Sequence, residues 1–426
     1  MELSPSRGTQ DLVPPDGGRM RALYDRAAEL ARRWGFRYVE TPVFEATELF
    51  ARTSGETSDV VAKEMYTFTD RGDRSLTLRP EGTAPVMRAY LHERQRLGAP
   101  FKAYYLTRMY RYSRPQAGRY REHRQFGVEV LGTDAPAADV EAITIGDALL
   151  RSLGLRRYQV ELNSLGDEVC RPAYRAALLA YLDTRRGDLR DEHKDRFVDN
   201  PMRVLDCKDE ACRAVAAEAP IMLEHLCDAC DAHIDEVVAG VRAAGLTPVM
   251  TPTLVRGLDY YTRTAFEFVS DALQEGGNAQ QATLFGGGRY DGLAEALGGP
   301  RVPGVGFGMG LERVLLAVVD EGLAPPIERP LDAYVVAIGD TARATARPLV
   351  AELRAAGLAA DLAYEDRPLK AQLKMADRAG ARTAVIIGDQ ELATGAVTVR
   401  RMDDGHQRAV ALSGLAAALS TDGGSG

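Results

Sequence analysis

The chain has 426 residues, enough for two or three domains that each bury an adequate core. Hydrophobic residues make up 45% of it and charged residues 27%, as in an ordinary soluble protein, and no apolar run reaches the roughly 18 residues that span a bilayer. The net charge of −8 argues against nucleic-acid binding through bulk positive charge but not against a local basic surface. The N-terminal residues contain no apolar segment typical of a secretory signal, so we expect a cytoplasmic protein without membrane contact.

Strands and helices alternate irregularly along the first part of the chain. Apolar spacing predicts a helix over 19–34, with Asp16 as its N-cap, and then a strand over 36–44. A strand, a turn and a helix follow over 75–91, then two strands over 102–112 and 123–132, then a helix over 138–153. Strands separated by helices without regular alternation predict an α+β domain with an antiparallel sheet.

The middle and the end of the chain have a different character. Residues 165–250 are rich in helix formers and charge, and we interpret them as a helical insertion within one antiparallel α+β domain of residues 1–325. The proline-rich segment 323–331 reads as a linker. Beyond it, apolar strands alternate with helices, which predicts a small α/β domain of residues 331–420 with a largely parallel sheet.

Four of the five cysteines are clustered in the sequence. Cys207 and Cys212 form C-x4-C, Cys227 and Cys230 form C-x2-C, and Cys170 stands apart. Such a cluster can bind zinc through four thiolates, or it can be four reduced cysteines on helices of a small domain. Both interpretations remain open.

Arginines and tyrosines are concentrated between residues 104 and 124. Residues 108–124 hold six arginines and one acid, and five tyrosines interleave with them over 104–120. Guanidinium groups match phosphate oxygens and aromatic rings stack on bases, although a solvated hairpin would have the same composition.

A second unusual pattern is the alternating glycines of 304–310, which leave little side chain to pack and suggest that a planar group lies against the strand. Neither a phosphate-binding P-loop nor a dinucleotide fingerprint is present, so a bound nucleotide would lie on an antiparallel sheet.

Several segments resemble the motifs of class II aminoacyl-tRNA synthetases. RYVETPVFE (37–45) resembles motif 1, TRMYRYSRPQAGRYREHRQFGVEVLG (107–132) motif 2, and GVGFGMGLER (304–313) motif 3. LVRGLDYYTRTAFEF (254–268) and GGGRYDGL (286–293) resemble the two signatures of the histidyl-tRNA synthetase family. The resemblance covers essentially the whole chain, including a C-terminal domain similar to that family's anticodon-binding domain.

The resemblance implies a reaction and its partners. Histidine would attack the α-phosphate of ATP to give histidyl-adenylate and pyrophosphate, and the histidyl group would then pass to the 3′ end of histidine tRNA. ATP with Mg²⁺ would be the nucleotide substrate. Motif 1 implies a homodimer, because it lies at the subunit interface in this class.

The resemblance also assigns the site residues. Arg111 and Arg256 would contact the α-phosphate and act in catalysis. The ATP-binding residues implied are Arg111, Arg119, Arg121, His123, Gly306, Gly308, Gly310 and Arg313. The histidine-binding residues implied are Glu81, Thr83, Arg111, Gln125, Glu129, Arg256, Tyr260, Tyr261 and Tyr290. The loop residues Arg114 and Gln116 would meet the extra 5′ guanosine of histidine tRNA.

The roles within the histidine pocket follow the chemistry of the ligand. Glu81 and Thr83 would hold the α-amino group, and Glu129 with Tyr261 the imidazole, whose two nitrogens allow rejection of other amino acids. Glu129 lies between two valines of a strand, so its side chain points to the face opposite theirs.

The chain departs from the family pattern at Ser113, where motif 2 usually carries a glutamate.

Two other family assignments compete with a histidyl-tRNA synthetase. One is the regulatory subunit of an ATP phosphoribosyltransferase, which the C-terminal domain and the GLDYY segment disfavour. The other is a threonyl or prolyl synthetase, which Glu129 and GGGRYDG disfavour.

Overall fold

The structure is a computed structural model and describes residues 3–54, 63–190, 194, 197, 200–205, 207, 209–255, 260–275, 282–325 and 331–421. Two compact units divide the chain, Met1–Ile327 and Glu328–Gly426. Each has its own sheet and its own core.

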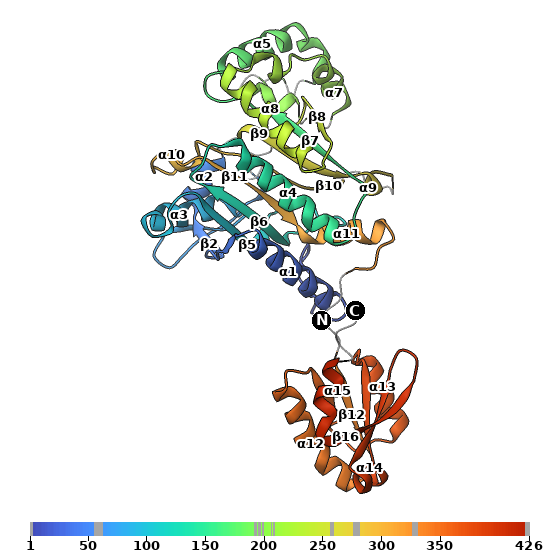
Figure 1. The fold of residues 1–426 in the computed structure, drawn as a ribbon. Helices are drawn as coiled ribbons and strands as arrows, with labels where there is room; N and C mark the ends of the chain where they lie inside the picture. Colours follow the sequence, from blue (N-terminus) through green and yellow to red (C-terminus); the bar gives the residue numbers. More distant parts are fainter. Residues whose placement is uncertain are drawn as a thin grey trace. The chain divides into compact units, whose positions relative to one another are not determined.

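An eight-stranded sheet forms the centre of the first unit (Figure 1). Its order across the sheet is β1 (Arg37–Tyr38), β5 (Phe101–Tyr110), β6 (Glu122–Leu131), β11 (Gly304–Gly310), β10 (Thr283–Arg289), β9 (Thr262–Ser270), β7 (Tyr158–Ser164) and β8 (Pro248–Met250). The outermost pairs, β1–β5 and β7–β8, are parallel, and all the inner pairs are antiparallel. The central strands therefore come from both the N-terminal and the C-terminal parts of the unit.

Helices cover one face of this sheet and form the main core. They are α1 (Asp16–Arg33), α4 (Pro136–Ser152), α8 (Asp228–Ala243) and α11 (Leu311–Asp320). Val128 and Phe307 belong to this core, so alternate residues of β6 and β11 point toward the helices. The intervening residues of both strands must then point to the other face, where α3 (Thr83–Leu97) packs through Val86 and Met87.

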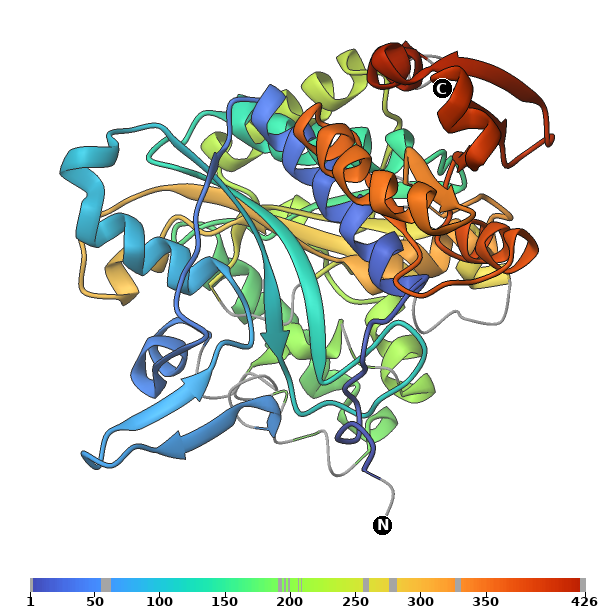
Figure 2. The same ribbon diagram turned by 90° about the horizontal axis from the view of Figure 1, so that it is seen from below.

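Smaller elements complete the unit. A separate three-stranded sheet has the order β2 (Phe44–Ala46), β4 (Ser75–Leu78), β3 (Tyr66–Thr69), and Figure 2 shows it in blue, apart from the large sheet. Helix α2 (Thr47–Ser54) follows β2, and the short helices α9 (Asp271–Glu275) and α10 (Leu293–Ala296) follow β9 and β10.

Between β7 and β8 the described chain is helical. It contains α5 (Arg171–Thr184), α7 (Glu210–Ala217), α8 and short 3-10 turns, and Leu178, Val204 and Val215 lie in a core of its own. This is the location predicted for the helical insertion.

Arg289 of the GGGRYDGL segment is fully buried, and it holds β10 to the helices. Its guanidinium group pairs with Asp139 of α4 and lies 3.1 Å from Asp291 Oδ1, while His233 of α8 lies 3.4 Å from Asp139. Removing one member of a buried charge group leaves the others unpaired at a cost of about 3–5 kcal/mol. This arginine is therefore part of the scaffold that fixes α4 and the insertion helix α8 on the sheet.

The second unit has a five-stranded sheet. Its order is β13 (Ala360–Leu362), β12 (Ala333–Ala337), β14 (Thr383–Ile387), β15 (Ala396–Arg401) and β16 (Gln407–Ala411). Helices α12 (Asp340–Ala355) and α15 (Leu415–Thr421) contribute to the core on one face, α13 (Leu369–Arg378) packs on the other, and α14 (Asp389–Thr394) precedes β15.

The predicted α+β fold class is confirmed, but four details differ from the sequence analysis. Asp16 is the first residue of α1 and not its N-cap, a position that Pro15 occupies. The strand predicted over 36–44 is split into β1 and β2, because the chain leaves the large sheet before Pro42 and joins the small one after it. The hairpin β15–β16 was not predicted, since its residues are mixed in polarity. The C-terminal sheet is consequently half antiparallel and not largely parallel.

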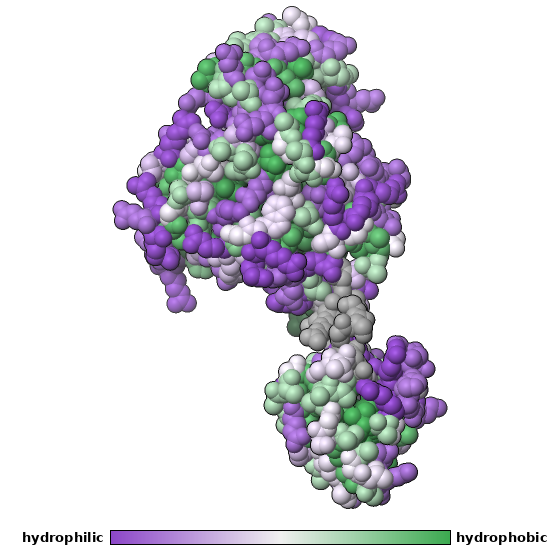
Figure 3. Space-filling view, in the orientation of Figure 1, coloured by the Kyte–Doolittle hydropathy of each residue, from purple (hydrophilic) through white to green (hydrophobic). Residues whose placement is uncertain are grey.

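On the face drawn in Figure 3, hydrophilic residues dominate the first unit and apolar residues occur in small separate groups. Among the described residues, no helix has both the length and the apolar character that crossing a membrane requires.

Candidate active site

The large sheet carries a buried polar network on the face opposite its main core. Glu129 of β6 is completely buried and accepts hydrogen bonds from Thr83 (2.8 Å), Tyr105 (3.3 Å) and the Tyr290 hydroxyl. Gln125, also on β6, donates to the Tyr105 hydroxyl at 3.1 Å. These side chains come from three strands or their ends and from the start of α3, so only the folded sheet assembles them.

A second buried carboxylate adjoins this network. Glu81 accepts hydrogen bonds from the backbone N–H groups of Thr83 (2.8 Å) and Ala84 (2.9 Å), at the N-terminus of α3. The Tyr260 hydroxyl lies 3.4 Å from it. Tyr260, Tyr261 and Tyr290 are all buried and meet at ring-centroid distances between 4.7 and 6.5 Å, so they form an aromatic wall beside the two acids.

The glycines of β11 make room for these side chains. Gly306 lies opposite Glu129 in the register of β6 and β11, and a Cβ there would overlap the Glu129 carboxylate. A Cβ at Gly308 would overlap the Gln125 amide, whereas one at Gly310 would meet nothing within 4 Å. Gly306 and Gly308 thus accommodate polar side chains of β6, whereas Gly310 leaves open space.

The protonation of Glu129 is unusual. Its pKa is raised from the ordinary 4.5 to about 8, chiefly by burial, while the hydrogen bonds from Tyr290 and Thr83 oppose the shift and the charge of Glu81 adds to it. Burial also raises the pKa of Glu81, against the opposing effects of the Ala84 and Thr83 N–H groups and of Arg111. Two desolvated acids side by side are suited to a ligand that brings positive charge or several N–H donors.

Positive charge is gathered next to the acids, around His123 of β6. Burial, and then the charges of Arg111, Arg313 and Arg119, lower the pKa of His123 to about 3, so its imidazole is neutral at pH 7. Burial, followed by Arg119 and Arg111, also lowers the pKa of Arg313. Guanidinium groups that crowd one another in this way are suited to a polyanion such as a triphosphate.

Arg111 belongs to both regions. Its Nε donates to Pro80 O at 2.7 Å, next to Glu81, and its charge acts on both Glu81 and His123. A ligand with a cationic end and an anionic end could therefore lie along this face of the sheet with its centre near Arg111.

Comparison with known proteins agrees with this geometry. The sequence model of "Histidyl-tRNA synthetase" matches residues 8–314, and that of "Anticodon binding domain" matches residues 332–422. The chain is 49% identical to the histidine–tRNA ligase of Moorella thermoacetica, with 97% of each chain covered, and 48% identical to that of Rhodococcus erythropolis, with 96% of each covered. It matches the crystal structure of apo histidyl-tRNA synthetase from S. aureus with a TM-score of 0.81 and 37% identity, over 98% of this chain and 100% of the other.

The chain belongs to the histidyl-tRNA synthetase family. The expected function, an ATP-dependent histidine–tRNA ligase, is confirmed by relatives of this similarity and coverage. The synthetase resemblance of the motifs is confirmed with it.

The structure brings most of the residues assigned from the family motifs into two adjoining groups. Seven residues that the resemblance assigns to histidine binding are all buried around one network: Glu81, Thr83, Gln125, Glu129, Tyr260, Tyr261 and Tyr290. The ATP-side residues Arg111, Arg119 and Arg313 surround His123. Arg256 lies outside the described residues, and its catalytic role stays a prediction.

The loop residues of motif 2 differ in their exposure and in their interaction partners. Arg119 pairs with Glu64 at 3.0 Å, whereas Arg121 stacks 3.9 Å from the centre of the Tyr112 ring and donates to Ser113 O. Arg121 thus has protein partners that hold it in place. Arg114 is exposed and Gln116 half-buried, and Gln116 pairs with Arg119 through the backbone.

Two site features were not anticipated. Tyr105 of β5 bonds both Glu129 and Gln125, and its ring fills the space beside Gly82 and Gly127. A glycine facing a tyrosine across a predicted hairpin could have indicated it. The other feature is Ser113, whose buried hydroxyl has no hydrogen-bond partner among the described residues.

The four clustered cysteines do not converge as one set, which was one of the two alternatives that the sequence left open. Cys207 and Cys212 pack in the apolar core of the insertion, where burial raises the pKa of the Cys212 thiol to about 12. Cys227 and Cys230, at the start of α8, instead lie beside Cys170 and Asp167. The sequence spacing was misleading because the chain fold, and not proximity along the chain, decides which thiols meet.

Adding a methyl group at Gly306 tests whether the glycine makes room for Glu129. We expect Gly306→Ala to raise the KM for histidine at least about tenfold, because Glu129 must move and its buried bonds are lost, a cost of at least about 1.4 kcal/mol. Gly187→Ala is the matched control, since Gly187 lies in the helical insertion and a methyl group there meets nothing within 4 Å. Equal KM values in the two variants would contradict this role.

The raised pKa of Glu129 predicts a pH-dependent stability. The native protein keeps this proton up to about pH 8, while the unfolded chain releases it near 4.5. The bound proton on Glu129 therefore contributes fully to the free energy of unfolding below about pH 4.5. This contribution is lost as pH rises through about 8, by at most about 1.4 kcal/mol per pH unit. Thermal unfolding should show Glu129→Gln gaining stability relative to the parent between pH 5 and pH 8. A pH-independent difference in melting temperature would contradict the shift.

Proposed function

We propose that the two groups on this sheet face bind the two substrates of histidine activation, with histidine over the buried acids and ATP over the arginines. Arg111, which acts on both groups, is the observation that carries this proposal. Joining a carboxylate to the α-phosphate brings two anions together, and a fixed guanidinium group between them lowers the barrier by neutralising and aligning both.

The histidine side follows from charge and shape. Glu81 and Thr83 bind the α-ammonium group, and Gln125 lies toward the carboxylate. Glu129, with Tyr261 and the walls Tyr260 and Tyr290, accepts the imidazole. An imidazole N–H adds a further donor to Glu129, and an amino acid without this donor loses that hydrogen bond at a cost of about 1–3 kcal/mol.

The nucleotide side uses Arg111 for the α-phosphate, together with the proposed Arg256. Arg119 and Arg121 serve the outer phosphates, His123 stacks on adenine as a neutral ring, and Arg313 closes the site from the other side. The open space above Gly310 allows close approach of the base. Attack by the histidine carboxylate releases pyrophosphate, and the resulting adenylate passes its histidyl group to the tRNA 3′ end.

Mg²⁺ accompanies ATP in the proposed reaction. In the described chain, the one group of three or more converging acidic, histidine or cysteine side chains lies at Asp167, outside this site. Glu312, beside the arginines, already accepts bonds from the backbone and side chain of Arg124. The residues therefore fit a magnesium ion held mainly by phosphate oxygens, a common arrangement for Mg²⁺.

Histidine-dependent exchange of pyrophosphate with ATP tests the central role of Arg111. We expect Arg111→Ala to lower the exchange rate about 10²–10³-fold, as for loss of one preorganised donor to a transition state. Arg108→Ala is the control, because Arg108 lies near the end of β5, just before Arg111, but is exposed and pairs with Glu122 at the surface. A loss of less than tenfold would exclude Arg111 from the reacting centre, and exchange with another amino acid but not histidine would overturn the substrate assignment.

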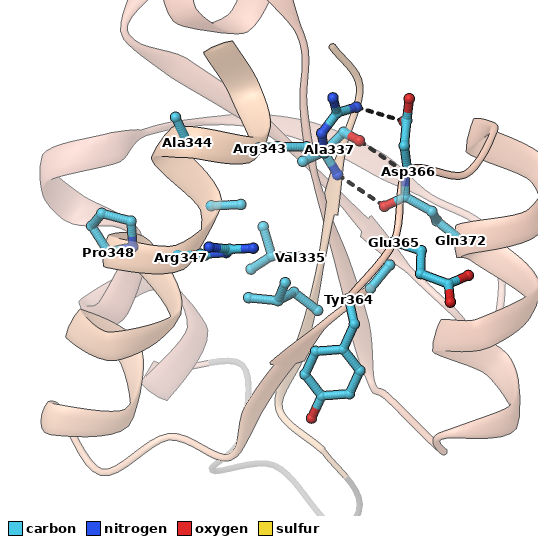
Figure 4. Close-up of a pocket in the computed structure, with 13 residues that line it drawn as sticks. Val335, Ala337, Arg343, Ala344, Arg347, Pro348, Tyr364, Glu365, Asp366 and Gln372 are labelled. Carbon is cyan, nitrogen blue, oxygen red and sulfur yellow. Dashed lines mark hydrogen bonds and ion pairs between the residues drawn. The ribbon is translucent and has the colours of Figure 1, made fainter. Parts of the chain in front are cut away.

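Transfer to tRNA requires contacts beyond this site. On the motif 2 loop, Arg114 and Gln116 are the proposed contacts to the 5′ guanosine. The C-terminal unit has an open pocket of about 460 Å³ between α12, β12 and residues 362–366 (Figure 4). Arg343 and Arg347 extend from α12 toward it, and the Tyr364 side chain is 87% exposed. An exposed ring in a pocket that also holds guanidinium groups suits an unstacked base, so this pocket is the proposed anticodon contact.

Tyr364 allows the anticodon contact to be tested separately from activation. We expect Tyr364→Ala to reduce kcat/KM for tRNA charging about 5–100-fold, the equivalent of roughly 1–3 kcal/mol for a lost base–aromatic stack. Pyrophosphate exchange should be unchanged, and Tyr364→Phe should retain charging because it keeps the ring. Full charging by Tyr364→Ala would exclude the stack.

The proposed enzyme acts in the cytoplasm, where charged tRNA is used.

The proposed enzyme is a homodimer. Motif 1 supports the dimer because it leaves large apolar side chains exposed to solvent. Tyr38, Val43 and Phe44 are 43–52% exposed, and Phe68 of the small sheet packs against Phe44 at a centroid distance of 6.2 Å. An exposed apolar group of this kind is typical of a surface that another subunit covers.

Light scattering with a charge placed in motif 1 tests the dimer. We expect Phe44→Arg to shift the protein from dimer to monomer, because burying an unpaired guanidinium group in an interface costs several kcal/mol. Val249→Arg is the control, since Val249 is similarly exposed but lies on β8, at the opposite edge of the sheet order from β1. A dimeric Phe44→Arg, or a fully active monomeric parent protein, would contradict the proposal.

A further inference from the structure

Four side chains with metal-binding atoms meet at the base of the helical insertion. They are Asp167 and Cys170, between β7 and α5, and Cys227 and Cys230, at the start of α8. One ligand atom from each lies within 4.8 Å of the other three. Cys170 and Cys230 are 3% and 0% exposed, so the group is largely closed to solvent.

The distances suit a tetrahedral ion. Zinc–sulfur bonds of about 2.3 Å place tetrahedral thiolates about 3.8 Å apart, and a thiolate and a carboxylate oxygen about 3.5 Å apart. Cys170 Sγ lies 3.9 Å from Cys227 Sγ and 3.2 Å from Asp167 Oδ1, and Cys227 Sγ lies 3.9 Å from the same oxygen. We propose that Asp167, Cys170, Cys227 and Cys230 form a structural zinc site.

The surroundings of the group support a metal. The Asp167 N–H donates to Cys170 Sγ at 3.2 Å, as backbone groups do toward metal-bound thiolates. Asp167 directs Oδ1 toward the thiols, while its Oδ2 lies 3.4 Å from Arg263 Nη2. Hydrogen-bonded carboxylates of this kind are typical of metal ligands. Thiolate-rich tetrahedral sites without an open position select zinc over magnesium or calcium.

The alternative chemistry is a redox pair of Cys227 and Cys230. A C-x2-C pair at a helix start can exchange disulfides, but such a pair needs two sulfurs and access for a partner thiol. Here two further donors, Asp167 and Cys170, converge on the pair, although exchange requires neither of them. The arrangement is therefore better explained by coordination than by exchange.

The site connects the insertion to the histidine pocket. Leu165 N donates to Arg263 O at 2.6 Å, and Arg263 N donates to Gly166 O at 2.8 Å. Arg171, at the start of α5, donates to the carbonyl of Tyr261, a residue of the pocket wall. A bound ion would fix α5 and α8 to this junction, so its loss should loosen the insertion first.

Metal analysis of the full-length protein tests the site. The protein is purified without chelators from zinc-containing medium, and metal content is measured by mass spectrometry. We expect about one zinc per chain and a content at least about tenfold lower in Cys230→Ser. Cys207→Ser is the matched control, because Cys207 belongs to the same insertion but not to the group, and it should keep its zinc.

A second measurement covers the case in which Cys230→Ser does not fold. The parent protein, stripped of zinc, is titrated with Co²⁺, and we expect thiolate-to-cobalt charge-transfer absorption with three-thiolate intensity. Hydrogen exchange should then show α5 and α8 less protected without metal. The proposal is overturned by absence of bound zinc, by iron in its place, by equal zinc loss in Cys207→Ser, or by a Cys227–Cys230 disulfide in the purified protein.

Discussion

The close approach of β6 and β11 is the constraint on which the site depends. Glu129 and Gln125 extend over β11 only because Gly306 and Gly308 have no side chains. The same strands alternate their other residues into the main core, so the register that buries Val128 and Phe307 also aims Glu129 at the pocket. A shift of one residue would exchange the two faces and place a carboxylate in the apolar core.

The polarity of this face then determines the chemistry. Two acids are desolvated at one end and arginines crowd one another at the other, with Arg111 between them. Neither group is at its lowest free energy alone, since the Glu81 and Glu129 carboxyl groups are desolvated and Arg313 lies close to like charges. The proposed substrates carry the complementary charges, so their binding would offset the desolvation of the acids and the repulsion among the arginines. It would also place the carboxylate and the α-phosphate beside Arg111, where the new bond forms.

The insertion is attached to the same scaffold from two sides. Arg289, Asp139 and His233 tie α8 to α4 and β10 in a buried charge group. The Asp167 group joins α5 and α8 next to Arg263, at the beginning of β9. The positions of the tyrosine wall and of the insertion are thereby linked through short, specific contacts.

The sequence by itself determined the fold class, the family and most of the candidate site residues. The order of the motifs can be read directly from the sequence. The alternation of apolar and polar residues around Glu129 already predicts the sheet face to which its side chain points. Only the tertiary structure decided that Tyr105 bonds Glu129, that Arg121 has partners within the protein, and that Cys170 joins Cys227 and Cys230 in place of Cys207 and Cys212. The physical reason is that the period of the hydrophobic residues and the local composition reveal which residues share a strand or a helix face. Which thiol, ring or guanidinium group meets another from a distant segment depends on packing across the sheet, which leaves no local pattern in the sequence.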